Sequence, residues 1–317
     1  LYDLVHSHSY LNGPVGIQLK NTWGIRFIDS FHSLILVEDE ITGSSNQITE
    51  IRTKIENLIC RNADRIIANN DQEKTDLMDL YRVDPDLISI VPSGVNLELF
   101  QPLPQNESRK EIAFPDDVFL ITYVGGLEEQ DGLDILLKAI HLVDNPLIQA
   151  VIIGGPRSEK PFLSWADLSQ PPYEKFITMV DEYGLDKQIT FIGGKPQGQL
   201  AKYYSAGDIT VIPSLYDPYG MVAKEALACG SSVIASRVSG LIPAVQENRV
   251  GSLFEPGHGT QLAEKIKIFF DQPKINQEMR ANARSFAEEN FDWRSVAEEV
   301  TRVYQMVLEE TTINPET

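Results

Sequence analysis

Short apolar runs alternate with amphipathic stretches along nearly the whole chain. The runs have the length of buried strands, and the stretches between them carry apolar residues at helical spacing. Strands that alternate with helices are typical of βαβ units around a parallel sheet. The predicted strands are 1–6, 26–31, 65–68, 88–91, 119–124, 148–153, 189–192, 209–212, 232–235 and 251–254. The predicted helices are 15–23, 48–62, 72–80, 133–142, 175–183, 199–206, 221–228, 261–271, 275–290 and 293–309, and 160–173 is expected to be a surface loop.

A proline-rich linker at 102–106 divides this pattern, and the alternation restarts after it. In doubly wound folds, ligands bind beyond the carboxyl ends of the strands, where the strand order reverses. The glycine pairs Gly125-Gly126 and Gly193-Gly194 each follow a predicted strand, so they are candidate binding loops. We predict an α/β protein of two doubly wound domains that face each other across a ligand-binding cleft.

Charge and cysteine content narrow the possible partners. The 317 residues include 27 basic and 46 acidic side chains, for a formal net charge of −19. This balance argues against a nucleic-acid partner, because phosphates require a basic face. The apolar runs are too short to span a bilayer, so no integral membrane segment is expected. The two cysteines fit a reducing compartment, and we expect a cytoplasmic protein.

Several common site motifs are absent from the sequence. No GxGxxG follows a strand, which disfavours a dinucleotide-dependent dehydrogenase, and no GxxxxGK[ST] indicates a P-loop NTPase. The sequence also lacks a GxSxG nucleophile elbow and a cluster of histidines and cysteines with metal-ligand spacing. We therefore expect no bound metal and no cofactor.

The most specific segment runs from 213 to 230, where a predicted strand ends and a helix begins. Asp217 lies in the turn before the helix, and Glu225 lies within the helix. The N-terminus of a helix offers free N–H groups and a positive dipole end, which suit a diphosphate. A carboxylate accepts hydrogen bonds from sugar hydroxyls. The two acids could each hold one sugar ring with the diphosphate between them; alternatively, Asp217 caps the helix and Glu225 is a solvated or core-edge residue.

This segment resembles the E-P-F-G-x-x-x-x-E-A-x-A-C-G signature of the family 4 retaining glycosyltransferases, with Asp217 in place of the first glutamate and Tyr219 in place of phenylalanine. The likeness covers nearly the whole chain. HSHSYLNG at 6–13 is similar to the family's H-x-H-x-x-x-x-G stretch, and FHSL at 31–34 is similar to its F/T-H-S/T-L stretch. Further matches are ADRIIA at 63–68 with Glu73, VPSGVN at 91–96, FQP at 100–102, FIG at 191–193 with Pro196, and AGD at 206–208. The sucrose-phosphate-synthase and inositol-phosphate glycosyltransferase branches are the most similar.

The resemblance implies the GT-B fold, two Rossmann-like doubly wound domains with a cleft between them. The first domain, 1–103, is on the acceptor side and is incomplete, and the second, 104–291, binds a nucleotide-sugar. The last helix, within 292–317, is expected to cross back to the first domain. The implied reaction is transfer of a sugar from a donor, most simply UDP-linked, to an unidentified small acceptor with retention at the anomeric carbon. No metal or other cofactor is implied.

The resemblance also assigns roles to individual residues. Asp217 would contact hydroxyls of the donor sugar, and Glu225 would bind the ribose of the nucleotide. His32 would lie beside the donor sugar at the reacting centre. The remaining donor-binding residues would be Gly125, Gly126, Gly193, Gly194, Lys195, Tyr219, Gly220, Met221 and Val222, largely through their backbones. His6, His8 and Tyr10 would line the acceptor side.

Two features depart from the family pattern. Where the family has G-R-L-x-x-x-K-G, this chain has Gly125 to Gly132 as GGLEEQDG, so Gly126 and Asp131 replace the arginine and lysine expected to neutralise the donor diphosphate. Arg157 and Lys195 are the cations in neighbouring loops that could substitute for them. The second departure is that Leu1 corresponds to the middle of the first domain, so about half of that domain is expected to be missing.

These departures leave a rival to an active transferase. The rival is a non-catalytic relative that binds a donor or a partner after losing its phosphate clamp. A nucleotide-sugar epimerase or a phosphorylase of similar fold is a third interpretation, but no lysine lies in a recognisable cofactor-holding context.

Overall fold

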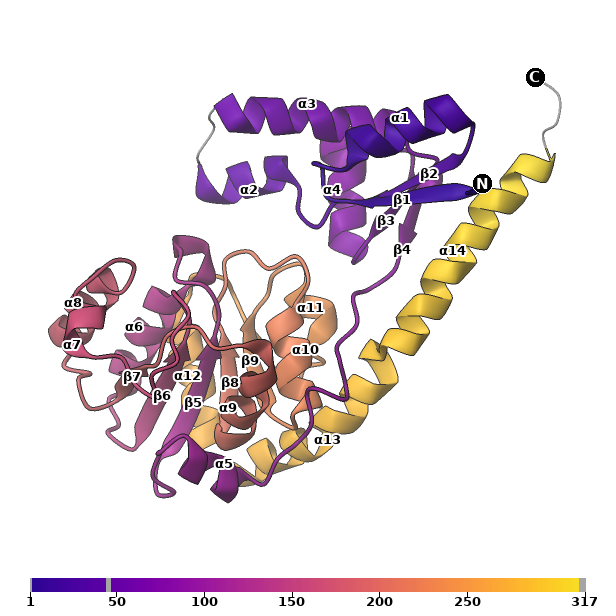
Figure 1. The fold of residues 1–317 in the computed structure, drawn as a ribbon. Helices are drawn as coiled ribbons and strands as arrows, with labels where there is room; N and C mark the ends of the chain where they lie inside the picture. The colour runs from indigo at the N-terminus through magenta and orange to yellow at the C-terminus, as the bar shows by residue number, and fades with distance from the viewer. Residues whose placement is uncertain (1, 44–46, 314–317) are drawn as a thin grey trace. The chain divides into compact units, whose positions relative to one another are not determined.

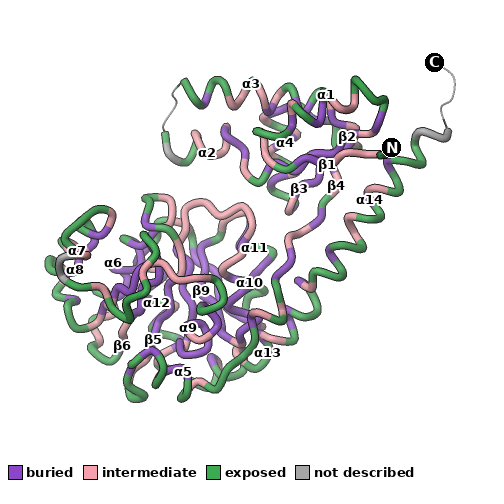
Figure 2. The backbone as a smooth tube through the Cα atoms, viewed as in Figure 1, coloured by how far each residue is buried: buried purple, intermediate pink, exposed green. Residues whose placement is uncertain are grey.

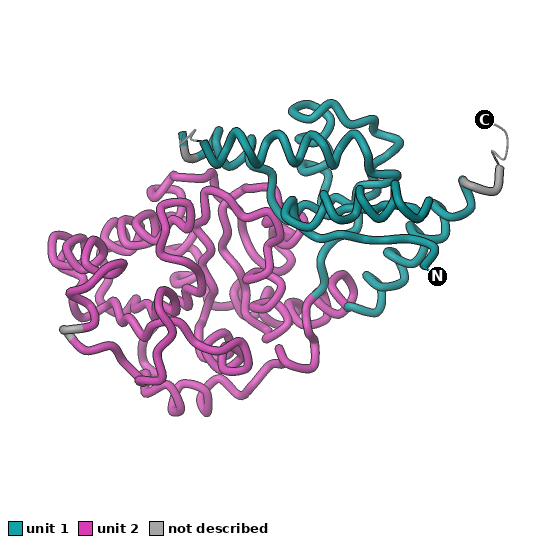
Figure 3. The backbone as a smooth tube through the Cα atoms, turned by 45° about the horizontal axis from the view of Figure 1, so that its top comes forward, with its two compact units in different colours: residues 1–94, 293–317 teal, residues 95–292 magenta. Residues whose placement is uncertain are grey.

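The computed structural model describes residues 2–43 and 47–313 and divides into two compact units. Unit 1 comprises Leu1–Gly94 with Trp293–Thr317, and unit 2 comprises Val95–Asp292 (Figure 3). The divisions fall at 94/95 and 292/293, whereas the sequence placed them at 103/104 and 291/292. The segment 95–103 therefore belongs with unit 2, where Val95 pairs with Asp292 and Phe100 lies in the core.

Unit 1 is a parallel four-stranded sheet covered on both faces. The strand order is β1-β2-β3-β4, and every neighbouring pair is parallel (Figure 1). Phe27, Ile59 and Leu77 form the core on one face, and Ile28 and Val307 belong to a second core on the other. The strands are β1 Leu4–His8, β2 Arg26–Ser30, β3 Arg65–Ala68 and β4 Ile88–Ile90, and the helices are α1 Gly13–Trp23, α2 Ile35–Thr42, α3 Gln47–Asn62, α4 Asp71–Tyr81, the 3₁₀ turn η1 Pro85–Leu87, and α14 Trp293–Ile313.

Unit 2 is a parallel six-stranded sheet in the order β10-β9-β8-β5-β6-β7. The helices α9, α10 and α13 contribute to the core on one face, and α6, α8 and α12 contribute to the core on the other. The strands β8, β9 and β10 are buried along their length (Figure 2). The strands are β5 Phe119–Val124, β6 Ile148–Ile153, β7 Ile189–Phe191, β8 Ile209–Ile212, β9 Ser232–Ser236 and β10 Gly251–Phe254. The helices are α5 Gln105–Glu111, α6 Leu133–Val143, α7 Trp165–Leu168, α8 Glu174–Tyr183, α9 Leu200–Ala206, α10 Met221–Ala228, α11 Leu241–Ala244, α12 Gly259–Asp271 and α13 Pro273–Phe291, with 3₁₀ turns η2 Glu129–Asp131 and η3 Gln197–Gln199.

The strand order of unit 2 reverses between β5 and β8. From β5 the chain continues outward through β6 and β7, and it then returns to the opposite side of β5 to form β8, β9 and β10. The loops that follow β5 and β8 therefore leave the sheet side by side at its carboxyl edge. This is the position at which doubly wound sheets bind ligands.

Four short helices, α2, α5, α7 and α11, were not predicted from the sequence. The α5 segment is polar on all sides, so it has no apolar period; its packing comes from Arg109, whose guanidinium donates to Asp208 (2.6 Å). The α2 segment begins with consecutive apolar residues and continues with acidic ones, which also lacks a helical period. The stretch 160–173 was expected to be a loop, and that prediction is wrong for Trp165–Leu168, which forms α7.

None of the helices in the described part of the chain has the length and apolar content that crossing a membrane requires.

Candidate functional site

The turn between β8 and α10 is organised by the carboxylate of Asp217. Its Oδ1 accepts hydrogen bonds from the backbone N–H groups of Tyr219 (3.0 Å) and Gly220 (2.7 Å). The ladder of α10 then begins with the N–H of Lys224, which donates to the carbonyl of Gly220 (3.1 Å). Asp217 therefore holds the residues just ahead of the helix, but the N-cap residue of α10 is Gly220 and the helix has no side-chain cap, so Asp217 is not the helix cap that the capping interpretation expected. Two of the amides expected to bind the donor are used within the protein, and Met221 and Val222 follow them at the start of the helix.

Gly220 allows α10 to begin close to a neighbouring turn. Its φ is 63°, in the left-handed region that favours glycine. A β-carbon on Gly220 would also overlap the carbonyl oxygen of Gly240 and lie 3.0 Å from the Ala244 β-carbon. The Gly240 N–H in turn donates to the Asp217 carbonyl (2.8 Å). The backbone conformation and the close approach both require glycine at position 220.

Electrostatics around Asp217 involve a buried lysine. Burial raises the pKa of the Asp217 carboxyl, while its two backbone hydrogen bonds and Lys224 act in the opposite direction. Lys224 is 4% exposed, and its ammonium lies 5.3 Å from the centre of the Phe291 ring. Burial lowers the pKa of Lys224 to about 8, and Asp217 opposes that shift. A desolvated acid in the turn before α10 and a desolvated cation within α10 therefore act on each other.

Glu225 is buried within α10, and both of its carboxylate oxygens accept hydrogen bonds. The Gln197 side-chain amide donates to Oε1 (3.0 Å), and the Tyr204 hydroxyl donates to Oε2 (2.8 Å). Burial raises the pKa of Glu225, although these two hydrogen bonds oppose the change. The structure therefore contradicts the alternative in which Glu225 is a solvated residue: the side chain is 6% exposed and has polar partners on two other segments.

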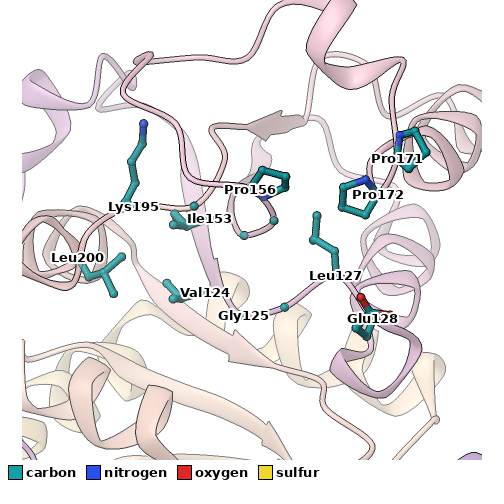
Figure 4. A pocket seen from close by; sticks show the side chains of 14 residues that line it. Val124, Gly125, Leu127, Glu128, Ile153, Pro156, Pro171, Pro172, Lys195 and Leu200 are labelled. Carbon is teal, nitrogen blue, oxygen red and sulfur yellow. The ribbon is translucent and has the colours of Figure 1, made fainter.

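A pocket of about 690 Å³ lies beyond the carboxyl ends of β5, β6 and β7 (Figure 4). Backbone and apolar side chains form most of its wall. Gly154 is glycine because a β-carbon there would overlap the carbonyl oxygen of Gly125. The lining residues are Val124, Gly125, Gly126, Leu127, Glu128, Ile153, Gly154, Gly155, Pro156, Pro171, Pro172, Gly194, Lys195 and Leu200. The predicted loops at Gly125-Gly126 and Gly193–Lys195 thus meet at one site, except that Gly193 itself is buried and does not line it.

The loop after β5 is closed by its own acidic side chain. Asp131 Oδ2 accepts a hydrogen bond from the Glu128 N–H (2.8 Å), and the Tyr123 hydroxyl donates to the Gly126 carbonyl (2.7 Å). Burial raises the pKa of Asp131, and the charges of Glu128 and Asp217 add to this effect. Lys175 on α8 acts in the opposite direction. The local field of this loop is therefore acidic, and Lys175, which opposes it, lies on a predicted helix but was not predicted as a site residue.

Neither of the two cations proposed from the sequence as substitutes points its charge freely into the pocket. The Lys195 ammonium donates to the carbonyl oxygens of Ser158 (2.8 Å) and Lys160 (2.5 Å), and Figure 4 shows its side chain extending away from the glycine loops. Burial lowers the pKa of Lys195. Arg157 lies 3.4 Å from Glu159, and its side chain is 70% exposed. Lys195 thus bonds to the segment that follows β6, and Arg157 pairs with a residue of its own loop.

His6 and His8, predicted for the acceptor side, and His32, predicted for the reacting centre, gather toward the carboxyl ends of β1 and β2 in unit 1. The rings of His6 and His8 are 4.3 Å apart, and those of His8 and His32 stack at 5.3 Å. His6 bonds through Nδ1 to the Tyr304 hydroxyl (2.8 Å) and through Nε2 to Ser30 Oγ (3.0 Å). Burial, with help from His8 and His32, lowers the pKa of His6 to about 4, and burial and His8 also lower the pKa of His32.

His32 and Tyr10 have contrasting local settings. His32 keeps much of its surface exposed, so its desolvation is only partial, and it has a φ of 68°, a conformation that a non-glycine residue adopts at a cost of about 1–3 kcal/mol. Tyr10 is half-buried, with the Arg52 guanidinium 4.6 Å from its ring centre. Arg52 also donates to Glu56 (2.7 Å) and Glu38 (3.0 Å). The structure therefore brings His6, His8 and His32 together, while Tyr10 packs against a separate ionic cluster.

Four residues at these sites were not found from the sequence: Gln197, Tyr204, Lys175 and Tyr304. Each is a polar residue far along the chain from its partner, and none lies in a recognised motif. Within 2–43 and 47–313, no group of three or more His, Cys, Asp or Glu side chains is placed to hold a metal ion.

Comparison with known proteins agrees with this geometry. Residues 104–286 match the family described as glycosyl transferases group 1, and residues 2–99 match glycosyltransferase family 4. D-inositol 3-phosphate glycosyltransferase of Corynebacterium glutamicum is 32% identical over 325 residues, which cover 100% of this chain and 75% of that protein. D-inositol 3-phosphate glycosyltransferase 1 of Catenulispora acidiphila is 31% identical over 316 residues, covering 97% and 73%.

Solved structures show the same fold. Sucrose-phosphate synthase of Thermosynechococcus elongatus superposes with a TM-score of 0.84 at 30% identity, covering 98% of this chain and 74% of that one. HepE of Anabaena, solved with UDP and glucose, superposes with a TM-score of 0.78 at 20% identity, covering 96% and 78%. Two parallel-sheet α/β domains of this kind define the GT-B class of proteins. The chain belongs to the group 1 glycosyltransferase family and is a transferase enzyme, so the expected fold and family are confirmed.

Proposed function

We propose that this glycosyltransferase takes a UDP-linked sugar as its donor and transfers the sugar to a small-molecule acceptor with retention at the anomeric carbon. The observation that carries the proposal is the placement of Glu225 and Asp217 on either side of the start of α10, at the strand-order reversal of unit 2. Two carboxylates on either side of a helix N-terminus match a donor with a ribose, a diphosphate and a hexose.

Glu225 is assigned to the ribose. Its carboxylate is desolvated and already accepts two hydrogen bonds, so it is held as a preorganised acceptor for hydroxyl groups. The pocket lined by Gly125, Gly126, Gly194 and Lys195 would receive the base, chiefly through backbone contacts. A glycine-rich wall permits the close approach that a planar base requires.

Asp217 is assigned to the donor sugar. Its Oδ1 is used by the Tyr219 and Gly220 amides, so a sugar hydroxyl would be accepted by Oδ2. Met221 and Val222 begin the helix and would direct its positive end at the diphosphate. As the bond to the anomeric carbon breaks, negative charge grows on the leaving diphosphate, and preorganised N–H groups stabilise that charge.

The histidine group of unit 1 is assigned to the acceptor. The lowered pKa values of His6 and His32 favour neutral imidazoles, in which one ring nitrogen donates a hydrogen bond and the other accepts one. Both nitrogens of His6 already bond to Tyr304 and Ser30, so His6 is assigned to holding the histidine group in place. A neutral donor–acceptor pair suits hydroxyl groups of an acceptor. As the family resemblance implies, His32 is proposed to act at the reacting centre. The reaction as proposed requires donor and acceptor and no further cofactor.

Calorimetric titration with UDP tests the proposal. Wild type should bind UDP, and Glu225→Ala should weaken binding by about 10- to 100-fold, because a charged hydrogen-bond partner is lost. Glu225→Gln should have a milder effect. Glu264→Ala is the control, because Glu264 is an exposed glutamate on α12 in the same unit. Unchanged affinity in a folded Glu225→Ala variant would reject the ribose assignment.

A further inference from the structure

The two oxygens of the Glu225 carboxylate have unequal partners. Oε2 accepts from Tyr204, a residue of α9 that is 0% exposed. Oε1 accepts from Gln197, which is exposed on the 3₁₀ turn η3. One oxygen is therefore bound inside the core, and the other is bound at the surface.

Tyr204 is a fixed partner. Its ring lies edge-on to Phe100 at 6.2 Å in the core, and both residues are fully buried. Burial and the neighbouring Glu225 charge raise the pKa of the tyrosine hydroxyl, so it remains protonated and donates. Moving this ring would require repacking of the core, which is dense and costly to disturb. Oε2 thus keeps its partner when a ligand arrives.

Gln197 is an exchangeable partner. It follows the loop at Gly193–Lys195 that borders the pocket, and η3 is closed by a backbone hydrogen bond from Gln199 to Pro196 (2.8 Å). Because the Gln197 side chain is exposed, its amide can bond to water after it leaves Glu225. Releasing this bond requires only a rotation of the side chain, with no change in the core.

We propose that Gln197 is a positioning residue that occupies the ribose-binding oxygen of Glu225 until a nucleotide displaces it. The inference rests on the proposed function, in which Glu225 receives the ribose hydroxyls. A desolvated carboxylate oxygen without a donor is unfavourable, and the Gln197 amide satisfies Oε1 when no nucleotide is bound. The ribose hydroxyls then compete with Gln197 for one oxygen, while Tyr204 keeps the other oxygen and the orientation of the carboxylate.

The consequence is a measurable competition. Gln197→Ala removes the competitor without touching the core, so UDP should bind about 2- to 10-fold more tightly, the range of one ordinary hydrogen bond. The affinity for 2′,3′-dideoxyuridine diphosphate should stay the same, because that nucleotide has no hydroxyls to compete for Oε1. The ratio of the affinity for UDP to the affinity for 2′,3′-dideoxyuridine diphosphate should therefore rise. Gln199→Ala is the matched control, being another exposed glutamine of the same turn.

The ratio distinguishes this role from a merely structural one. A loosened η3 turn would weaken both nucleotides together and leave the ratio at its wild-type value. An unchanged or reduced ratio in Gln197→Ala would overturn the inference. If wild type binds UDP and Glu225→Ala weakens it while the Gln197→Ala ratio stays unchanged, only the positioning role fails. If wild type does not bind UDP, the proposed function fails and this inference fails with it.

Discussion

The Asp131 carboxylate fills the space that a side chain on Gly126 would occupy. A β-carbon built on Gly126 would overlap Asp131 Oδ2 and lie 2.8 Å from Cγ. The same Oδ2 accepts from the Glu128 N–H at 2.8 Å. The two positions at which this chain lacks the cations of the family pattern are therefore coupled. An acid at 131 closes the loop, and glycine at 126 provides the room for it.

This coupling predicts how the variants that restore the two cations rank in their affinity for UDP. Gly126→Arg alone should leave UDP affinity unchanged or lower it, because the new side chain collides with Asp131. Asp131→Lys alone should strengthen binding modestly, because it removes a repulsive charge. The double variant should bind best, with each charge-assisted contact contributing up to about 10- to 100-fold. Calorimetry at low and moderate salt measures this, and the gain should shrink as salt rises.

Glu129→Lys is the control for general charge, since it makes the same change in net charge as Asp131→Lys on an exposed residue of the same loop. A Glu129→Lys gain as large as that of Asp131→Lys would assign the effect to the overall field. A double variant that binds no better than wild type would show that this enzyme stabilises the diphosphate without a side-chain clamp, through backbone amides.

A second prediction concerns the start of α10. Gly220→Ala should lower the Tm and weaken UDP binding, because alanine there is strained in φ and overlaps the Gly240 carbonyl. The strain in φ alone costs about 1–2 kcal/mol. Gly184→Ala is the matched control: its φ is 67°, and a β-carbon there meets nothing within 4 Å. The additional loss of Tm in Gly220→Ala over Gly184→Ala measures the overlap with the Gly240 carbonyl. Equal losses of Tm in the two variants would contradict a role for that overlap.

A third prediction follows from two neighbouring strands of unit 1 that carry an acid and a histidine with opposite changes in pKa. Burial raises the pKa of Asp29 to about 7, although Ser7 donates to it, and Glu56 adds to the rise. Asp29 Oδ2 is buried without a hydrogen-bond partner among the described residues. Burial lowers the pKa of His6 to about 4. As the pH falls from 7 to 4, the folded state binds a proton at Asp29 that the unfolded state lacks, whereas the unfolded state binds one at His6.

The two contributions therefore have opposite signs. The Asp29 contribution to stability is fully present below the pKa of the unfolded chain, 3.8, and is lost as the pH rises through about 7. The His6 contribution is present above 6.5 and is lost as the pH falls through about 4. In wild type the two pH-dependent contributions nearly cancel between pH 4 and 6.5, because the folded state then holds one extra proton at Asp29 and the unfolded state one at His6. A tenfold change in either acid dissociation constant on folding corresponds to about 1.4 kcal/mol.

Substitution separates the two groups. Asp29→Asn should lose stability on acidification from pH 7 to 4 relative to wild type, and His6→Gln should gain it, each by about 2–3 kcal/mol. Denaturant unfolding of the three proteins across this pH range gives the free energy of unfolding of each. Subtracting the wild-type values from those of each variant removes the contribution of titratable groups elsewhere in the chain. Parallel profiles for all three would contradict the assigned pKa directions.

The strands of unit 2 illustrate what could be predicted along the chain. The prediction for 119–124 agrees with β5 residue for residue, and 209–212 agrees with β8, because buried parallel strands are continuous apolar runs bounded by turn residues. The turn and helix that carry Asp217 and Glu225 were also predicted, because these residues are contiguous in sequence, while their roles toward a donor stay predictions. By contrast, α5 was missed because its packing rests on Arg109 and no apolar period marks it.

By itself, the sequence determined the βαβ order, the family and the acids at the start of α10, since these depend on local spacing. The tertiary structure alone decided which partners those acids have. Gln197 and Tyr204 reach Glu225 from 28 and 21 residues away, and Tyr304 reaches His6 from 298 residues away. No periodicity encodes such contacts, because polar side chains far apart in the sequence acquire these partners only when the elements that carry them pack together. Likewise, the sequence showed glycine and aspartate where cations were expected. Only the tertiary structure showed that the Asp131 side chain fills the space beside Gly126, because which atoms occupy a given space depends on how the loop folds.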